Sequence, residues 1–155
     1  MQSLIKIQRL PVSIDLAWEF FSNPANLNKI TPREMNFRIT SKRPEGKMYP
    51  GMIITYKVSP LMGIPLTWVT EITQVREHEF FIDNQVHGPY KFWHHQHLFR
   101  EVPEGVEITD ILHYAAPFGF FGRILEGMFI KKKVEGIFIY RERILKEMFP
   151  AGRST

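Results

Sequence analysis

Apolar and polar residues alternate along much of this chain with the period of two that is typical of β-strands. Turn-forming sequences such as PLMGIP, HGPY and VPEG separate the alternating stretches. The pattern predicts seven strands, at residues 3–10, 35–42, 52–59, 66–75, 79–86, 90–102 and 106–115.

Three segments have a helical pattern instead. Ser13 follows the first strand as a candidate helix cap, and residues 14–22 then carry an apolar stripe. Residues 23–32 predict a second short helix that ends at Pro32. Residues 121–149 predict one long helix, whose apolar stripe includes Leu125, Met128, Val134, Ile137, Phe138, Ile144, Leu145 and Met148.

These elements predict an α+β fold in a single domain spanning residues 1–155. An antiparallel sheet can curl around the long helix, so that one sheet face and one helix stripe are buried together. The two short helices would close one edge. We expect such an arrangement to leave a cavity between the sheet and the helix.

The segment 80–114 contains acidic residues and histidines among its large apolar residues. Successive side chains leave opposite faces of a strand, so Trp93, His95, His97 and Phe99 share one face. We assign this face to the interior because it carries the larger rings. The neighbouring strands then present their own residues inward, namely Phe81, Asp83, Gln85, Asp110 and Tyr114.

The turn VPEG also predicts which residues face each other across the sheet. A four-residue hairpin loop there pairs Phe99 with Ile108, His97 with Asp110, His95 with Leu112 and Trp93 with Tyr114. A loop at residues 87–91 pairs Phe81 with His97, Asp83 with His95 and Gln85 with Trp93. Each histidine then has a carboxylate opposite it.

Composition excludes several classes of protein. The 155 residues contain no cysteine, which excludes disulfides and thiolate metal sites. The first twenty residues lack the apolar stretch of a signal peptide, and no run reaches membrane-spanning length, so we expect a cytoplasmic protein without a transmembrane segment. The net charge is +4. No nucleic-acid-binding motif accompanies it, and we expect no nucleic-acid partner.

The basic cluster Lys131, Lys132 and Lys133 fits a solvated helix face, with transient membrane contact or partner docking as the alternative. The sequence does not determine the oligomeric state.

The residues that could carry chemistry are Asp83, His95, His97 and Asp110. The chain has no G-x-S-x-G turn, phosphate-binding glycine loop or H-E-x-x-H helix. His95, His97 and one of the two aspartates could form a two-histidine, one-carboxylate metal site. His94 points away from that site in a regular strand, and we expect no metal and no cofactor. The four residues otherwise form structural pairs, orient a ligand, or act as acid and base.

Four segments carry a resemblance to a known family: VSIDLAWEFFSNPANLNKITP, FFIDNQVHGPYKFWHHQHLF, GVEITDILHYAAPFGFFG and IFIYRERI. The chain resembles the helix-grip, or SRPBCC, superfamily, which includes START lipid-transfer domains, pollen-allergen-like proteins and polyketide cyclases. It is most similar to the bacterial polyketide cyclase/dehydrase-like subfamily, some of whose members are labelled cell division inhibitors.

The resemblance implies a helix-grip fold with a hydrophobic ligand pocket. The residues expected to line it are Phe81, Asp83, Gln85, Trp93, His95, His97, Phe99, Asp110, Tyr114, Phe121, Leu125 and Met128.

We expect this pocket to bind a hydrophobic or amphipathic small molecule that is lipid-like or polyketide-like. The alternatives are a cyclase/dehydratase-like enzyme that uses the His/Asp residues, and a protein-interaction or cell-division role. Perturbed His or Asp pKa values beside a cavity would favour catalysis, whereas an apolar cavity with every polar group satisfied would favour carriage.

Overall fold

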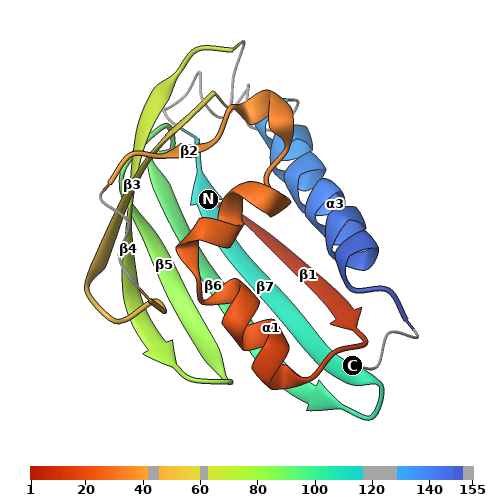
Figure 1. Cartoon of the computed structure of the whole chain (residues 1–155). Helices are drawn as coiled ribbons and strands as arrows, with labels where there is room; N and C mark the ends of the chain where they lie inside the picture. The colour runs from red at the N-terminus through yellow and green to blue at the C-terminus, as the bar shows by residue number, and fades with distance from the viewer. Residues whose placement is uncertain (42–45, 60–62, 117–128, 152–155) are drawn as a thin grey trace.

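A computed structural model gives the fold, and it describes residues 1–41, 46–59, 63–116 and 129–151. One antiparallel sheet curves around a long helix (Figure 1). In chain order the elements are β1 (Gln2–Leu10), α1 (Ile14–Phe21), the 3₁₀ helices η1 (Pro24–Ile30) and η2 (Arg33–Met35), β2 (Arg38–Ile39), β3 (Met52–Val58), β4 (Leu66–Arg76), β5 (Phe80–His87), β6 (Phe92–Val102), β7 (Gly105–Ala115) and α3 (Lys131–Met148).

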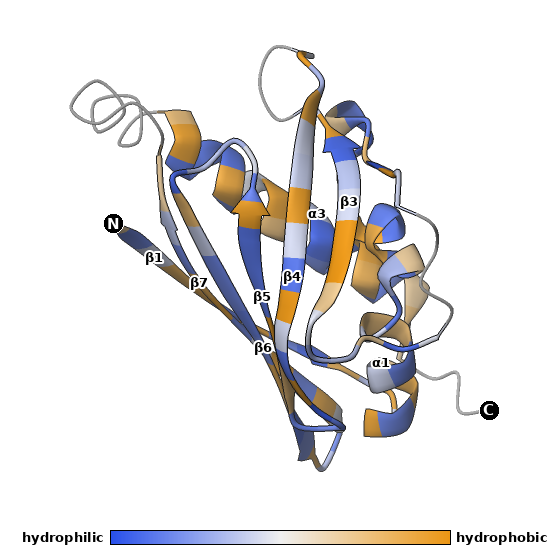
Figure 2. Cartoon of the chain, turned by 90° about the vertical axis from the view of Figure 1, so that its left-hand side faces the viewer, coloured by the Kyte–Doolittle hydropathy of each residue, from blue (hydrophilic) through white to orange (hydrophobic). Residues whose placement is uncertain are grey.

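The sheet has the strand order β1-β7-β6-β5-β4-β3-β2. Consecutive strands from β2 to β7 form hairpins, and β1 joins the far side of β7, where Gln2 pairs with Tyr114. Apolar and polar residues alternate along β4 in Figure 2, as expected for a strand with one buried face. Register shifts between β4 and β5 mark irregularities of the kind that bend a sheet.

The VPEG turn sets the register between β6 and β7 as predicted. All four pairs across this hairpin are confirmed, including His97 with Asp110 and Trp93 with Tyr114. Gly105 has φ +136°, and a side chain there would collide with the backbone carbonyl of Leu10. Only glycine fits this turn, because the position needs a positive φ and leaves no space for a Cβ atom.

Helix α1 is anchored at both its cap and its core face. The Ser13 hydroxyl accepts a hydrogen bond from the Leu16 amide at 3.2 Å, so the predicted cap is confirmed. On the inner face, Trp18 is 2% exposed. Its ring meets the rings of Phe81 and Phe99 edge-on, with centroids 6.2 and 5.3 Å away. This contact fixes α1 against β5 and β6.

Helix α3 lies beside β1 and across the open side of the sheet (Figure 1). Its stripe of buried residues is Val134, Phe138, Arg141 and Leu145, which recur every three or four positions. Met148 is 39% exposed, so its predicted place on the buried stripe is wrong. Residues 121–128 of the predicted helix, with Leu125 and Met128, lie outside the described residues.

Two predictions about residues 23–42 need correction. The second short helix is present, but it is a 3₁₀ helix that begins at Pro24. The strand predicted at 35–42 is reduced to the two residues of β2. Met35 belongs to η2, and Asn36 has a left-handed φ of 47°, a conformation that interrupts a strand.

Candidate functional site

A cavity of about 130 Å³ lies between the concave face of the sheet and α3. Most of its wall is apolar and aromatic, with residues from β3 to β6 on one side and Ile137, Phe138 and Arg141 of α3 on the other. Residues of α1 and η1 and their flanking segments close a further side. Small-molecule sites have this character, an apolar enclosure with a few polar groups at fixed places.

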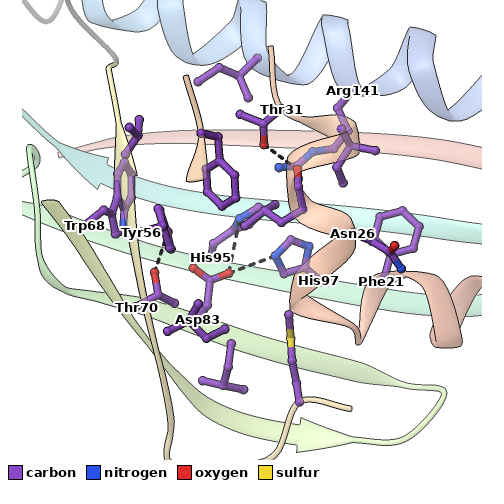
Figure 3. Close-up of a pocket in the computed structure, with 18 of the residues that line it drawn as sticks. Phe21, Asn26, Thr31, Tyr56, Trp68, Thr70, Asp83, His95, His97 and Arg141 are labelled. Atoms are coloured by element: carbon purple, nitrogen blue, oxygen red, sulfur yellow. Dashed lines mark hydrogen bonds and ion pairs between the residues drawn. The ribbon is translucent and has the colours of Figure 1, made fainter. Parts of the chain in front are cut away.

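Three polar side chains of the cavity wall, Asp83, His95 and His97, form a cluster with Asp110, which contacts both histidines without lining the cavity. We call these four residues the His/Asp cluster. Asp83 comes from β5, the two histidines from β6, and Asp110 from β7. The imidazole rings lie 3.8 Å apart between centroids. His95, His97 and Asp110 are buried, and the Asp83 side chain is 15% exposed. Figure 3 shows Asp83 turned toward both imidazoles.

Each carboxylate in the cluster contacts both imidazoles. Asp110 Oδ1 lies 2.9 Å from His95 Nε2 and 2.8 Å from His97 Nδ1. Asp83 Oδ2 lies 3.1 Å from His97 Nε2 and 3.7 Å from His95 Nδ1. Hydrogen-bond geometry is met by His95 with Asp110 and by His97 with Asp83. The hydrogen bonds therefore run diagonally between strands, although the directly opposite pairs are also in contact.

Burial and charge give the two histidines different protonation states. Burial, together with the adjacent His97, lowers the pKa of His95 below its ordinary value of 6.5. Burial also acts to lower the pKa of His97, but its close contacts and charge interactions with Asp110 and Asp83 outweigh burial and raise it. The pKa of Asp110 lies well below its ordinary value, since its contacts with both histidines outweigh the effect of burial. As the pH rises, His95 is therefore the first of the two rings to lose its proton, and His97 keeps its proton to a higher pH.

The neutral state of His95 determines where its proton lies. Nε2 is the ring nitrogen within hydrogen-bonding distance of a carboxylate. Nε2 therefore carries the proton and donates a hydrogen bond to Asp110. Nδ1 then keeps its lone pair, 3.7 Å from Asp83 Oδ2 and beyond a hydrogen bond. An aspartate that orients a neutral imidazole in this way leaves the second nitrogen able to accept a proton.

We expect the two imidazoles to titrate on opposite sides of 6.5 in an NMR experiment on the ring protons, His95 below that value and His97 above it. The depressed pKa of His95 makes stability fall as the pH drops below 6.5. The raised pKa of His97 has the opposite effect on stability. Its contribution to the free energy of unfolding is full below pH 6.5 and is lost as the pH rises through the folded-state pKa. Coincident titration of both rings would contradict this assignment.

Other polar groups of the cavity lie outside the cluster. The Tyr56 hydroxyl and Thr70 Oγ1 share a hydrogen bond of 2.8 Å, and burial raises the pKa of Tyr56 far above its ordinary value. Arg141 projects from α3 into the cavity (Figure 3). Its Nη1 lies 3.9 Å from Asp110 Oδ1, and its guanidinium lies over the Phe138 ring at 5.2 Å.

The structure brings together some of the residues predicted for the site and separates others. Phe81, Asp83, Trp93, His95 and His97 line the cavity. Of the other predicted residues within the described part of the chain, Asp110 contacts both histidines but does not line the cavity, and Phe99 and Tyr114 belong to the buried core.

Gln85 is not paired with Trp93, because the ladder between β5 and β6 ends at Asn84 and His94. The Gln85 side chain instead bonds the backbone N–H and carbonyl of Tyr90, at 3.2 and 2.7 Å. Phe121 lies outside the described residues.

Sequence reasoning missed several residues of the cavity that carry polar groups, among them Arg141, Trp68 and Thr70. Arg141 occupies the apolar stripe of α3 between Phe138 and Leu145, and that spacing is the signal that could have found it. Trp68 shares its strand face with Thr70, and the same parity argument that selected the histidines would have selected both.

Asp83, His95 and His97 also bring one potential metal-ligand atom each within 4.8 Å of the others. In the structure His97 Nε2 and Asp83 Oδ2 bond each other, and the raised pKa of His97 opposes the loss of the proton that metal binding would require. His94 turns to the opposite face, where its Nδ1 lies 2.6 Å from Asn84 Oδ1. The expectation of a site without metal stays a prediction.

Comparison with solved structures identifies the fold. A protein from Mycobacterium smegmatis is 17% identical with a TM-score of 0.65, and the match covers 94% of this chain and 92% of that one. A Chromobacterium violaceum protein is 7% identical with a TM-score of 0.73, covering 96% and 98%. Major latex-like protein 151 from ginseng, Panax ginseng, is 15% identical with a TM-score of 0.67, covering 96% and 97%.

The chain has the helix-grip fold. A seven-stranded antiparallel sheet around a long C-terminal helix, with short helices after the first strand, is the arrangement predicted from the sequence. The sequence itself matches no family model and no curated protein. Among the described residues, no helix combines the length and apolar character needed to cross a membrane.

Proposed function

We propose that this helix-grip protein binds a hydrophobic or amphipathic small molecule in the cavity between sheet and α3, as a member of the polyketide cyclase/dehydrase-like subfamily. The partly enclosed, mainly apolar cavity is the observation that carries the proposal. Its volume of about 130 Å³ is comparable with the roughly 150 Å³ engineered cavity that binds benzene, so the cavity has the size for a single small ring.

The aromatic wall supports a ligand with a flat or ring-shaped apolar part. Trp68 and Trp93 meet edge-on with ring centroids 5.1 Å apart, and Tyr90 lies 4.7 Å from Trp93. Tyr56 stacks on the other side of Trp68 at 5.8 Å. These rings present both faces and edges to a bound molecule. A ligand ring could therefore stack on one of them or meet another edge-on, the two arrangements that aromatic pairs favour.

A second candidate function is proton-transfer catalysis on a bound substrate. The specific observation that favours it is the pair of oppositely shifted histidine pKa values beside the cavity. A neutral His95 held by Asp110 would act as the base, and the cationic His97 as a nearby acid. Cyclisation and dehydration of a ketone-rich substrate both need such proton transfers.

The test of binding uses N-phenyl-1-naphthylamine, an uncharged dye that fluoresces in apolar surroundings. Ile54 lines the cavity and is 3% exposed, whereas the adjacent Ile53 faces outward and is 50% exposed. We expect saturable dye binding that falls more than tenfold in Ile54→Trp, because the indole fills the cavity, and that is unchanged in Ile53→Trp. Dye fluorescence and melting temperature would be measured for all three proteins.

Absence of saturable binding by the folded wild-type protein would reject the proposal. Equal binding by Ile54→Trp and wild type, with both folded, would place the dye elsewhere and reject this cavity as the site.

A further inference from the structure

Besides His97 Nδ1, which lies 2.8 Å from Asp110 Oδ1, two buried N–H groups on side chains that line the cavity have no acceptor among the described residues. They are Nε1 of Trp68, on β4, and Nε of Arg141, on α3. Neither nitrogen can accept a hydrogen bond, so each needs an acceptor atom from elsewhere. Buried donors are paired in the great majority of folded proteins, and an unpaired donor that lines a cavity points to a ligand acceptor.

The two donors lie apart in the cavity. Figure 3 shows Trp68 and Arg141 on opposite sides of Asp83, His95 and His97. The nearby Tyr56 hydroxyl is already paired with Thr70, and therefore it does not compete for the same acceptor. One acceptor atom could not serve donors on opposite sides, so a molecule that satisfies both carries two separate acceptors.

The charges around the cavity indicate what kind of acceptor fits. The carboxyl groups of Asp83 and Asp110 lie against two basic side chains, His97 and Arg141, so each acid of the cluster already has a basic group beside it. The cluster is therefore balanced before a ligand enters. A ligand carboxylate would leave an excess negative charge in a poorly solvated place, whereas a carbonyl oxygen pairs the donors without adding charge.

We propose that the ligand is an uncharged, apolar ring compound with two carbonyl oxygens, one accepting from Arg141 Nε and the other from Trp68 Nε1. This inference rests on the proposed binding function and specifies its ligand class. It separates this cavity from one that carries fatty acids, whose single polar end is anionic.

The experiment measures affinities for a graded set of para-substituted benzenes by calorimetry. 1,4-Diethylbenzene has no oxygen, 4-ethylacetophenone has one carbonyl, 1,4-diacetylbenzene has two, and 4-ethylbenzoate has a carboxylate. We expect 1,4-diacetylbenzene to bind roughly tenfold or more tightly than 1,4-diethylbenzene, and 4-ethylacetophenone to bind more tightly than 4-ethylbenzoate.

Two variants remove the donors one at a time. Trp68→Phe keeps an aromatic ring without the N–H, and Arg141→Met keeps a long side chain without the guanidinium. Each should lower the affinity for 1,4-diacetylbenzene by roughly tenfold more than the affinity for 1,4-diethylbenzene, whose change measures the loss of apolar contacts alone. Arg143→Met is the matched control, because Arg143 is exposed on the same helix and pairs with Glu147. Melting curves establish that each variant is folded.

The outcomes separate this inference from the proposed function. If wild type binds none of the four compounds, the binding function itself fails. If 1,4-diethylbenzene binds but 1,4-diacetylbenzene binds no more tightly, or if the donor variants lower both affinities equally, the cavity binds ligands and the inference about carbonyl oxygens is overturned. Tighter binding of 4-ethylbenzoate than of 4-ethylacetophenone overturns the uncharged class.

Discussion

Replacement of Asp110 by Ala should lower the free energy of unfolding by about 3 kcal/mol at pH 7, the low end of the range for breaking a buried charge pair. Asp110 is buried and contacts both imidazoles, at 2.9 and 2.8 Å. Without it, His97 keeps only Asp83 as its counter-charge, and His95 loses its hydrogen-bond acceptor. Urea unfolding of both proteins measures the difference.

The pH dependence of this loss has a definite sign. Because the pKa of Asp110 is lowered, its contribution to the free energy of unfolding is full at pH values above its ordinary pKa of 3.8. This contribution is lost as the pH falls through the folded-state pKa. The difference between wild type and Asp110→Ala should therefore shrink in strong acid. Asp110→Asn should cost less, since the amide oxygen still accepts a hydrogen bond. Glu101→Ala, at an exposed position of β6, is the control. A loss below about 0.5 kcal/mol in Asp110→Ala would refute the buried pair.

If the cavity supports proton transfer, His95→Gln should slow it roughly a hundredfold. The probe is 1,4-diacetylbenzene in deuterated water, whose methyl hydrogens exchange through an enolate. A methyl C–H bond breaks, the proton joins Nδ1 of His95, and a deuteron from solvent returns to the carbon. Mass spectrometry follows deuterium incorporation with and without protein. Glutamine keeps hydrogen-bonding capacity in place of His95 but cannot act as a base.

His94→Gln is the matched control, because His94 lies next in the chain and bonds Asn84 on the opposite face. Exchange should be unchanged in this variant. If wild type and His95→Gln accelerate exchange equally, or if neither accelerates it, His95 is not a base toward this ketone. Either result would leave ligand binding as the remaining proposed function.

The fold could be predicted largely from the sequence because alternation, turn chemistry and helix periodicity all agreed. VPEG shows this most clearly, since a turn that only glycine can complete sets the register of the longest hairpin. Prediction failed at 35–42, where alternation was present but Asn36 takes a left-handed conformation. Period-two patterning does not report backbone φ at single positions, so a short irregular segment escapes it.

The candidate site could be predicted only in part. Strand parity placed Asp83, His95 and His97 on the cavity side, because side-chain direction follows from position along a strand. The hydrogen bonds within the cluster were less accessible, since long side chains reach diagonal neighbours as well as opposite ones. Arg141 was missed because arginine is rarely buried. Its charge argued against an interior position, although its spacing along the helix favoured one. Its environment depends on tertiary contacts with Asp110 and Phe138.

The pairing of β1 with β7 has a consequence for how the protein folds. During synthesis the β1 segment appears first, yet its neighbour in the sheet begins at Gly105. The hairpins from β3 to β7 can form locally as the chain grows, whereas β1 must wait and close a loop of roughly a hundred residues. Because loop closure precedes the gain from such distant contacts, docking of β1 should limit the rate, and refolding should take milliseconds to seconds.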